Sequence, residues 1–82
     1  MEISPLRQDL IDYIVKRNLI KKWQKAEILF IENTKHPSLN TELLEPKHRG
    51  IFSFRIDQKY RALFFVKNSK AEVFAITNHY KK

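Results

Sequence analysis

The spacing of apolar residues changes once along this chain of 82 residues. Before residue 35 they recur three and four positions apart, as they do on one face of a helix. After residue 51 they alternate with polar residues, as in strands that bury one face. Since the helical pattern precedes the strand pattern, the sequence predicts one α+β domain over residues 1–82, with an N-terminal helical hairpin packed on a small antiparallel β-sheet.

Local signals place the ends of the two helices. Ser4 followed by Pro5 predicts the start of the first helix, because serine caps helices and proline at the first position loses no hydrogen bond. Asn18 interrupts the apolar pattern and is interpreted as the turn between the helices. The second helix is expected to end near Thr34, since a residue that precedes proline, as His36 does, disfavours a further helical turn.

The segment 37–50 is predicted to be an ordered loop, because it contains two prolines and Gly50 and shows no period. Three leucines are expected to hold it to the core: Leu39, Leu43 and Leu44. Three strands are expected after it, over residues 52–57, 60–67 and 72–78. The second of them is apolar on both faces, which is typical of a central strand.

The positive charge is confined to the second half of the chain. Residues 1–45 hold seven basic and seven acidic side chains, whereas residues 46–82 hold nine basic and two acidic ones and so carry the whole net charge of +7. A field concentrated in this way suits a polyanionic partner, either a nucleic acid or an acidic protein. A solvated basic surface that only aids solubility is the alternative interpretation.

The composition excludes several classes of protein. The chain has no cysteine, and therefore no disulfide framework, thiolate zinc site or cysteine nucleophile. No apolar run approaches the roughly 18 residues of a membrane span. The N-terminal residues also lack the pattern of a signal peptide. We therefore expect a cytoplasmic protein that does not associate with membranes.

Side chains suited to phosphoryl chemistry cluster in the basic half. If the turn after residue 56 has three residues, Arg55 and Arg61 lie opposite each other on neighbouring strands and form a two-guanidinium clamp for phosphate oxygens. His79 and Tyr80 follow the last strand. A histidine and a phenol near two arginines suit acid–base work on a phosphodiester.

Simpler interpretations exist for some of these residues. Arg55 is alternatively a solvated strand residue paired with Asp57 or Glu72. The chain has three histidines: His36, His48 and His79. Their spacing matches no metal-ligand pattern, so neither a metal nor a cofactor is expected. The sequence also contains no Gly-rich phosphate loop, no serine nucleophile elbow and no paired-carboxylate motif.

Three segments resemble a known family. They are the loop His36-Pro37-Ser38-Leu39, the stretch Ser-Phe-Arg-Ile-Asp-Gln-Lys-Tyr-Arg-Ala-Leu-Phe over residues 53–64, and the closing pair His79-Tyr80. They resemble the RelE/ParE superfamily of toxins from bacterial type II toxin–antitoxin systems, and most of all its YoeB-type branch. The resemblance covers nearly the whole chain and implies the microbial-RNase-like fold of that superfamily.

The resemblance implies a metal-independent endoribonuclease that cleaves mRNA, usually on the ribosome, and so inhibits translation. In the YoeB-type pattern a loop carboxylate is the general base, which falls on Glu42 here, with Glu45 close enough to compete. Arg61 would stabilise the pentacovalent phosphate, His79 would protonate the leaving 5′-oxygen, and Tyr80 would orient the substrate. Contacts with the RNA backbone are expected from Lys47, His48, Arg49, Arg55 and Lys59.

The same resemblance implies a cognate antitoxin with an acidic segment, in addition to mRNA and the ribosome. The protein would then exist as a homodimer or as a toxin–antitoxin hetero-oligomer. One alternative is a ParE-type toxin, since those members lack the nuclease residues and inhibit DNA gyrase. Another is a basic nucleic-acid-binding module, although the strands lack the exposed aromatic platform that stacking on bases requires.

Overall fold

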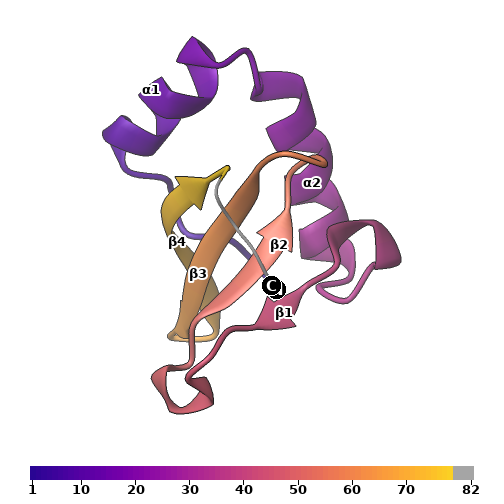
Figure 1. The fold of residues 1–82 in the computed structure, drawn as a ribbon, viewed down its shortest axis with the longest axis vertical. Helices are drawn as coiled ribbons and strands as arrows, with labels where there is room; N and C mark the ends of the chain where they lie inside the picture. The colour runs from indigo at the N-terminus through magenta and orange to yellow at the C-terminus, as the bar shows by residue number, and fades with distance from the viewer. Residues whose placement is uncertain (79–82) are drawn as a thin grey trace.

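The computed structural model describes residues 1–78, in which two helices and a four-stranded antiparallel sheet are formed (Figure 1). The elements are α1 (Gln8–Lys16), α2 (Ile20–Glu32), β1 (Glu42–Leu43), β2 (Phe52–Arg55), β3 (Arg61–Lys67) and β4 (Lys70–Thr77). The strands pair in the order β1-β2-β3-β4, so each strand neighbours the next one in the chain. The predicted α+β class is confirmed, and β3 is an inner strand as expected.

The helical hairpin is confirmed, but its first helix begins later than predicted. The N–H of Ser4 donates to Ala71 O and the N–H of Ala71 donates to Glu2 O, each over 2.9 Å. The first residues therefore run along β4 instead of starting a helix. Asn18 forms the predicted turn in the left-handed conformation, with φ of 57°. No helix within residues 1–78 is long and apolar enough to cross a membrane.

An aromatic cluster joins α2 to one face of the sheet. Phe30 and Phe54 are fully buried, and their ring centres lie 4.8 Å apart. The ring of Phe64 meets that of Phe30 edge-on at 5.2 Å, and Trp23 covers Phe54 at 5.9 Å. These separations are the favourable ones for aromatic pairs. The core therefore lies between the helices and this face, and the opposite face of the sheet is left for other side chains.

The connection between α2 and β2 holds more regular structure than the predicted loop. It contains two 3₁₀-helices, η1 (Pro37–Leu39) and η2 (Lys47–Arg49), with β1 between them. The prediction of three strands was therefore wrong, because β1 pairs with β2 at the edge of the sheet. Leu39 is buried as expected and Leu44 is half-buried, but Leu43 is 40% exposed because it lies on this edge strand.

Candidate active site

Arg55 and Arg61 face each other across strands β2 and β3. The N–H of Ile56 donates to Tyr60 O over 2.9 Å, so the hairpin closes around the three residues 57–59. A turn of three residues is the length at which the sequence predicts this pairing. The condition for the pairing is therefore met, and the two arginines lie opposite each other on the same face of the sheet.

That face is the one turned away from the helices. Phe54 and Ala62 are fully buried in the core on the helix side. Successive residues of a strand point to opposite faces of the sheet. The side chains of Ser53, Arg55 and Arg61 therefore project from the face opposite to the helices. Arg61 is nevertheless only 6% exposed, whereas Arg55 is half-buried. Arg61 therefore lies at the bottom of a recess, and Arg55 stands nearer to solvent.

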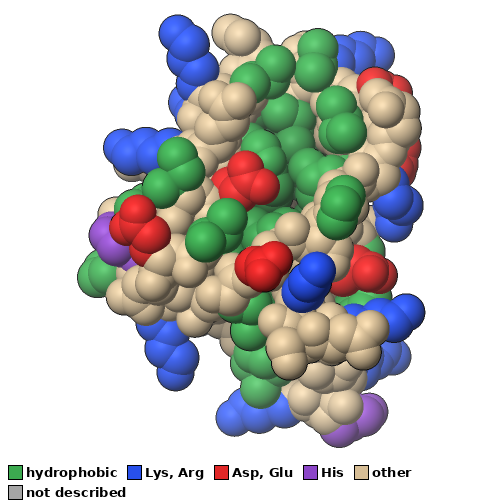
Figure 2. Space-filling view, turned by 180° about the vertical axis from the view of Figure 1, so that it is seen from behind, with side chains coloured by type: hydrophobic (Ala, Val, Ile, Leu, Met, Phe, Trp, Pro, Cys, Tyr) green, Lys and Arg blue, Asp and Glu red, His purple; other side chains and the backbone are tan. Residues whose placement is uncertain are grey.

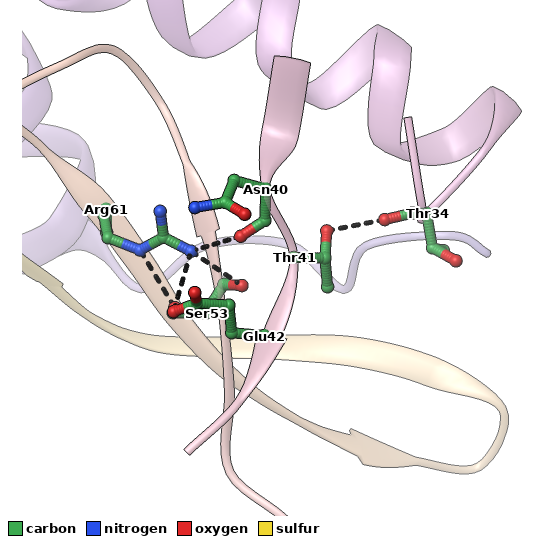
Figure 3. Close-up of polar contacts among 6 residues, drawn as sticks. All are labelled: Thr34, Asn40, Thr41, Glu42, Ser53 and Arg61. Carbon is green, nitrogen blue, oxygen red and sulfur yellow. Dashed lines mark hydrogen bonds and ion pairs between the residues drawn. The ribbon is translucent and has the colours of Figure 1, made fainter. Parts of the chain in front are cut away.

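The guanidinium of Arg61 is held by a set of oxygen acceptors (Figure 3). Its Nε donates to the hydroxyl of Ser53 over 3.0 Å. Its Nη2 donates to the backbone oxygen of Asn40 over 2.6 Å and to that of Ser53 over 3.3 Å. A buried cation is costly unless such partners surround it, and these contacts fix the plane of the group. The cation thus has a set position before any ligand arrives.

Glu42 lies next to this guanidinium. β1 pairs Glu42 with Ser53, and its Oε2 comes within 4.0 Å of Arg61 Nη2. The Glu42 side chain is only 14% exposed, whereas Glu45 is exposed and lies beyond the end of β1. Of the two carboxylates considered from the sequence, Glu42 is the one that the fold brings beside Arg61.

These groups line a recess of about 140 Å³, which we call the Arg61 cleft. Its lining residues are Asn40, Glu42, Arg55, Asp57, Gln58, Lys59 and Arg61. Three of them are cations and two are carboxylates, so the cleft places an acceptor for a proton beside groups that attract phosphate oxygens. This combination suits acid–base work on an anionic substrate.

Asp57 fixes the turn that carries Lys59 into the cleft. Its Oδ1 accepts from the N–H groups of Lys59 and Tyr60 over 2.8 and 2.7 Å, and its Oδ2 pairs with Lys22 at 3.0 Å. Burial alone would raise the pKa of Asp57, but the hydrogen bonds from Tyr60, Lys22 and Lys59 outweigh it and leave the pKa below its usual range. Asp57 therefore stabilises the turn. Its side chain pairs with Lys22 and not with Arg55, which was the pairing considered from the sequence.

Three of the other predicted residues do not line the Arg61 cleft. Lys47, His48 and Arg49 form η2, where all three are exposed. His79 and Tyr80 lie outside the described residues. No group of three or more metal-binding side chains occurs among the residues that the structure describes.

Two partners of Arg61 are not evident from the sequence. Ser53, whose side chain is buried, stands between Phe52 and Phe54 in the sequence of β2, and a small polar residue in an apolar strand was the available signal. Asn40 contributes its backbone oxygen, for which no side-chain pattern exists. Asn40 can bring this oxygen to Arg61 because it takes the left-handed conformation after η1, with φ of 44°.

The chain has a YoeB-like α+β fold, with two N-terminal helices on a four-stranded antiparallel sheet. It superposes on a YoeB dimer from Staphylococcus aureus with a TM-score of 0.69 and 20% identity, over 96% of this chain and 94% of that one. It superposes equally widely on a YoeB–YefM complex from the same organism, with a TM-score of 0.68 and 20% identity.

Comparison of the sequence itself gives no such match. No family model matches the chain. No curated protein matches it either. The resemblance inferred from the sequence motifs is therefore confirmed at the level of the fold, by structures that share one residue in five with this protein.

Proposed function

We propose that this protein is a YoeB-like toxin, a metal-independent endoribonuclease that cleaves mRNA on the ribosome in the cytoplasm and so inhibits translation. The observation that carries the proposal is the buried guanidinium of Arg61 beside the carboxylate of Glu42 in one cleft. A fixed cation in a site poor in water is suited to stabilising the charge that develops on phosphate oxygens. A nearby carboxylate is suited to accepting a proton.

The proposed reaction uses these groups in sequence. Glu42 accepts the proton of the ribose 2′-hydroxyl, and the 2′-oxygen then attacks the neighbouring phosphorus. Arg61 stabilises the pentacovalent phosphate. The bond to the 5′-oxygen breaks as His79 delivers a proton to it, while Tyr80 orients the substrate. Glu42 gains one proton and His79 loses one, so the reaction needs no proton from another source.

Substrate affinity is assigned to the basic half of the chain. Arg55 and Lys59 line the Arg61 cleft and would contact the phosphates nearest to the cleaved bond. The exposed side chains Lys47, His48 and Arg49 would contact RNA further along. The net charge of +7 supports such binding, because phosphate contacts release counterions from the RNA.

We also propose a protein partner that silences the toxin, as an antitoxin with an acidic segment would. The S. aureus protein of the same fold has been seen as a dimer and in a complex with YefM. Large aliphatic side chains remain exposed on the helices of this chain: Ile11, Val15, Ile20, Ile28 and Ile31. Figure 2 shows apolar side chains gathered in the middle of the rear face. A partner that covers them would stabilise a domain of this size.

Inducible expression in a bacterium tests the proposal, with growth scored and mRNA 5′ ends mapped. The wild type is expected to arrest growth and create new internal 5′ ends, and both effects are lost in Arg61→Ala and His79→Ala. Lys67→Ala, at the far end of β3, is the matched control and should behave as the wild type.

Two outcomes would contradict the proposal. Arrest without new 5′ ends, indifferent to His79→Ala, would indicate a gyrase-type target. Absence of arrest from a protein shown by circular dichroism to be folded would leave a binding module without nuclease activity.

A further inference from the structure

A second recess lies beside the Arg61 cleft, between α2, η1 and the end of β2. Its volume is about 450 Å³, and we call it the α2 groove. Its lining residues are Lys22, Lys25, Ala26, Leu29, Ser38, Leu39, Arg55, Ile56, Asp57 and Gln58. A volume of this order falls within the range of sites for small organic ligands, from roughly 300 to 1,000 Å³.

The α2 groove combines cations with an apolar lining. Lys22, Lys25 and Arg55 supply positive charge, and four of its other residues are apolar: Ala26, Leu29, Leu39 and Ile56. Its one carboxylate, Asp57, is already committed to Lys22 at 3.0 Å and to two backbone N–H groups. The groove is therefore suited to a ligand that has both an anionic group and an apolar part.

Lys25 and Arg55 differ from Asp57, because their side chains are not paired with another described residue. Neither the Lys25 nor the Arg55 side chain forms a hydrogen bond or ion pair with another residue in the range 1–78, whereas Lys22 is paired with Asp57. Lys25 is exposed on α2 and Arg55 is half-buried at the end of β2. An anion bound between them would displace no ion pair formed among residues 1–78.

The α2 groove is continuous with the Arg61 cleft. Arg55, Asp57 and Gln58 line both of them. A chain molecule with a phosphate in the cleft would therefore pass Arg55 and enter the groove with its next unit. Single-stranded RNA has the required character, because each nucleotide carries one phosphate and one flat base.

We propose that the α2 groove binds the nucleotide of single-stranded RNA next to the cleaved phosphate, with its phosphate at Lys25 and Arg55 and its base against the apolar lining. This inference rests on the proposed nuclease function and extends it to a subsite on α2. None of the α2 residues was expected to bind RNA from the sequence. The charge of the helical half is zero overall, so only the fold brings Lys25 to the basic site.

Binding of an RNA that cannot be cleaved tests the subsite apart from the chemistry. The probe is a fluorescent 2′-O-methyl octanucleotide, followed by anisotropy over a series of salt concentrations. Lys25→Glu is expected to weaken binding about tenfold and to reduce the salt slope by about 0.7, the value for one contact with a single strand. Lys67→Glu makes the same charge change at the exposed far end of β3 and should change the affinity less than twofold.

Cleavage of unmodified mRNA on ribosomes provides the second readout. The α2 groove does not hold the reacting atoms, so Lys25→Glu should raise KM and leave kcat unchanged. If Lys25→Glu and Lys67→Glu lose the same amount of RNA affinity, the subsite is wrong and the effect comes from the overall positive charge of the protein. An oligoglutamate peptide of the same charge as the RNA is tested as well. If Lys25→Glu loses affinity for this peptide but binds RNA as the wild type does, the RNA subsite is wrong and an acidic protein partner is indicated.

The two proposals fail in different ways. If the wild type cleaves RNA and Lys25→Glu binds and cleaves as the wild type does, the subsite is wrong and the nuclease function stands. If the wild type binds RNA through Lys25 but cleaves neither free RNA nor mRNA on ribosomes, the groove stands as an RNA site and the nuclease function is wrong. Circular dichroism of each variant confirms that a changed affinity does not come from unfolding.

Discussion

The Nη2 atom of Arg61 lies 4.0 Å from Oε2 of Glu42 and 2.6 Å from the backbone oxygen of Asn40. The distance between Nη2 and Oε2 is longer than a hydrogen bond, and the shorter of these two contacts is made to a main-chain oxygen. The charges attract each other across this gap in a recess with little solvent. The attraction therefore positions the Glu42 carboxylate while Arg61 keeps its hydrogen bonds to Ser53 and Asn40.

Glu42→Gln is expected to lower kcat by a factor of about 10² to 10⁴, since an amide cannot accept the proton and general-base catalysis contributes this much. The side chains have nearly the same shape, so the folded state should be kept. Glu45→Gln is the matched control and should retain the wild-type kcat, because Glu45 does not line the Arg61 cleft. Cleavage rates over a range of pH measure both, and a larger loss in Glu45→Gln would reassign the base.

Ser53→Ala is expected to lower both stability and activity. The variant removes the hydroxyl that accepts from Arg61 Nε over 3.0 Å in the interior, and loss of such an acceptor costs about 1–3 kcal/mol. The less constrained guanidinium should also lower kcat more than it raises KM. Urea unfolding and steady-state kinetics measure the two effects. Unchanged kcat in a folded variant would show that Ser53 has only a structural role.

Asp57→Asn is expected to lower the free energy of unfolding by about 1–3 kcal/mol at pH 7, because the hydrogen bonds to the turn lose their charge. The pKa of Asp57 is lowered in the folded state by these hydrogen bonds, so its contribution is present above about pH 4. It is lost as the pH falls through the folded-state pKa.

Urea unfolding of the wild type and Asp57→Asn at several pH values checks this sign. The difference between them should shrink below pH 4 and not grow. Lys22→Gln serves as the control, since it removes only the ion pair on the helix and should cost less than about 1 kcal/mol. A difference that persists unchanged into acid would mean that the charge of Asp57 does not contribute.

Ser69→Gly is expected to stabilise the protein. Asn68 and Ser69 join β3 to β4 with φ of 52° and 64°, and a two-residue turn with both values positive favours glycine at its second position. The gain should be about 0.5–1 kcal/mol, or several degrees in Tm for a chain of this size. Ser69→Ala keeps the Cβ atom and should bring no gain. An equal rise in both variants would trace the effect to the hydroxyl instead.

The fold was predictable where apolar periods and turn residues agreed. The two helices and the break at Asn18 follow from local pattern, whereas the β2–β3 register depends on the length of the turn between the strands, which the sequence leaves open. β1 could not be predicted, because Glu42 and Leu43 form a strand only through pairing with β2, which the loop sequence does not reveal. The start of α1 was misplaced for a similar reason: Ser4 donates its N–H to Ala71 of a distant strand instead of capping a helix.

The candidate site was predictable in its residue types more than in its arrangement. Spacing and the family resemblance selected Glu42 and Arg61, which the fold brings together. The burial of Arg61 could not be foreseen, because it depends on the loop that carries Asn40 folding over one face of the sheet. The α2 groove was missed since Lys25 and Arg55 are far apart in the sequence and share no motif.

The pairing of β1 with β2 determines when the site can form as the chain folds. Glu42, Ser53 and Arg61 come from three separate strands, and β1 consists of two residues only. A chain still being synthesised, or one cut between η1 and β2, could form both helices without placing Glu42 beside Arg61. The chemistry proposed for this site therefore requires the completed sheet, and a chain without β1 paired to β2 would lack it.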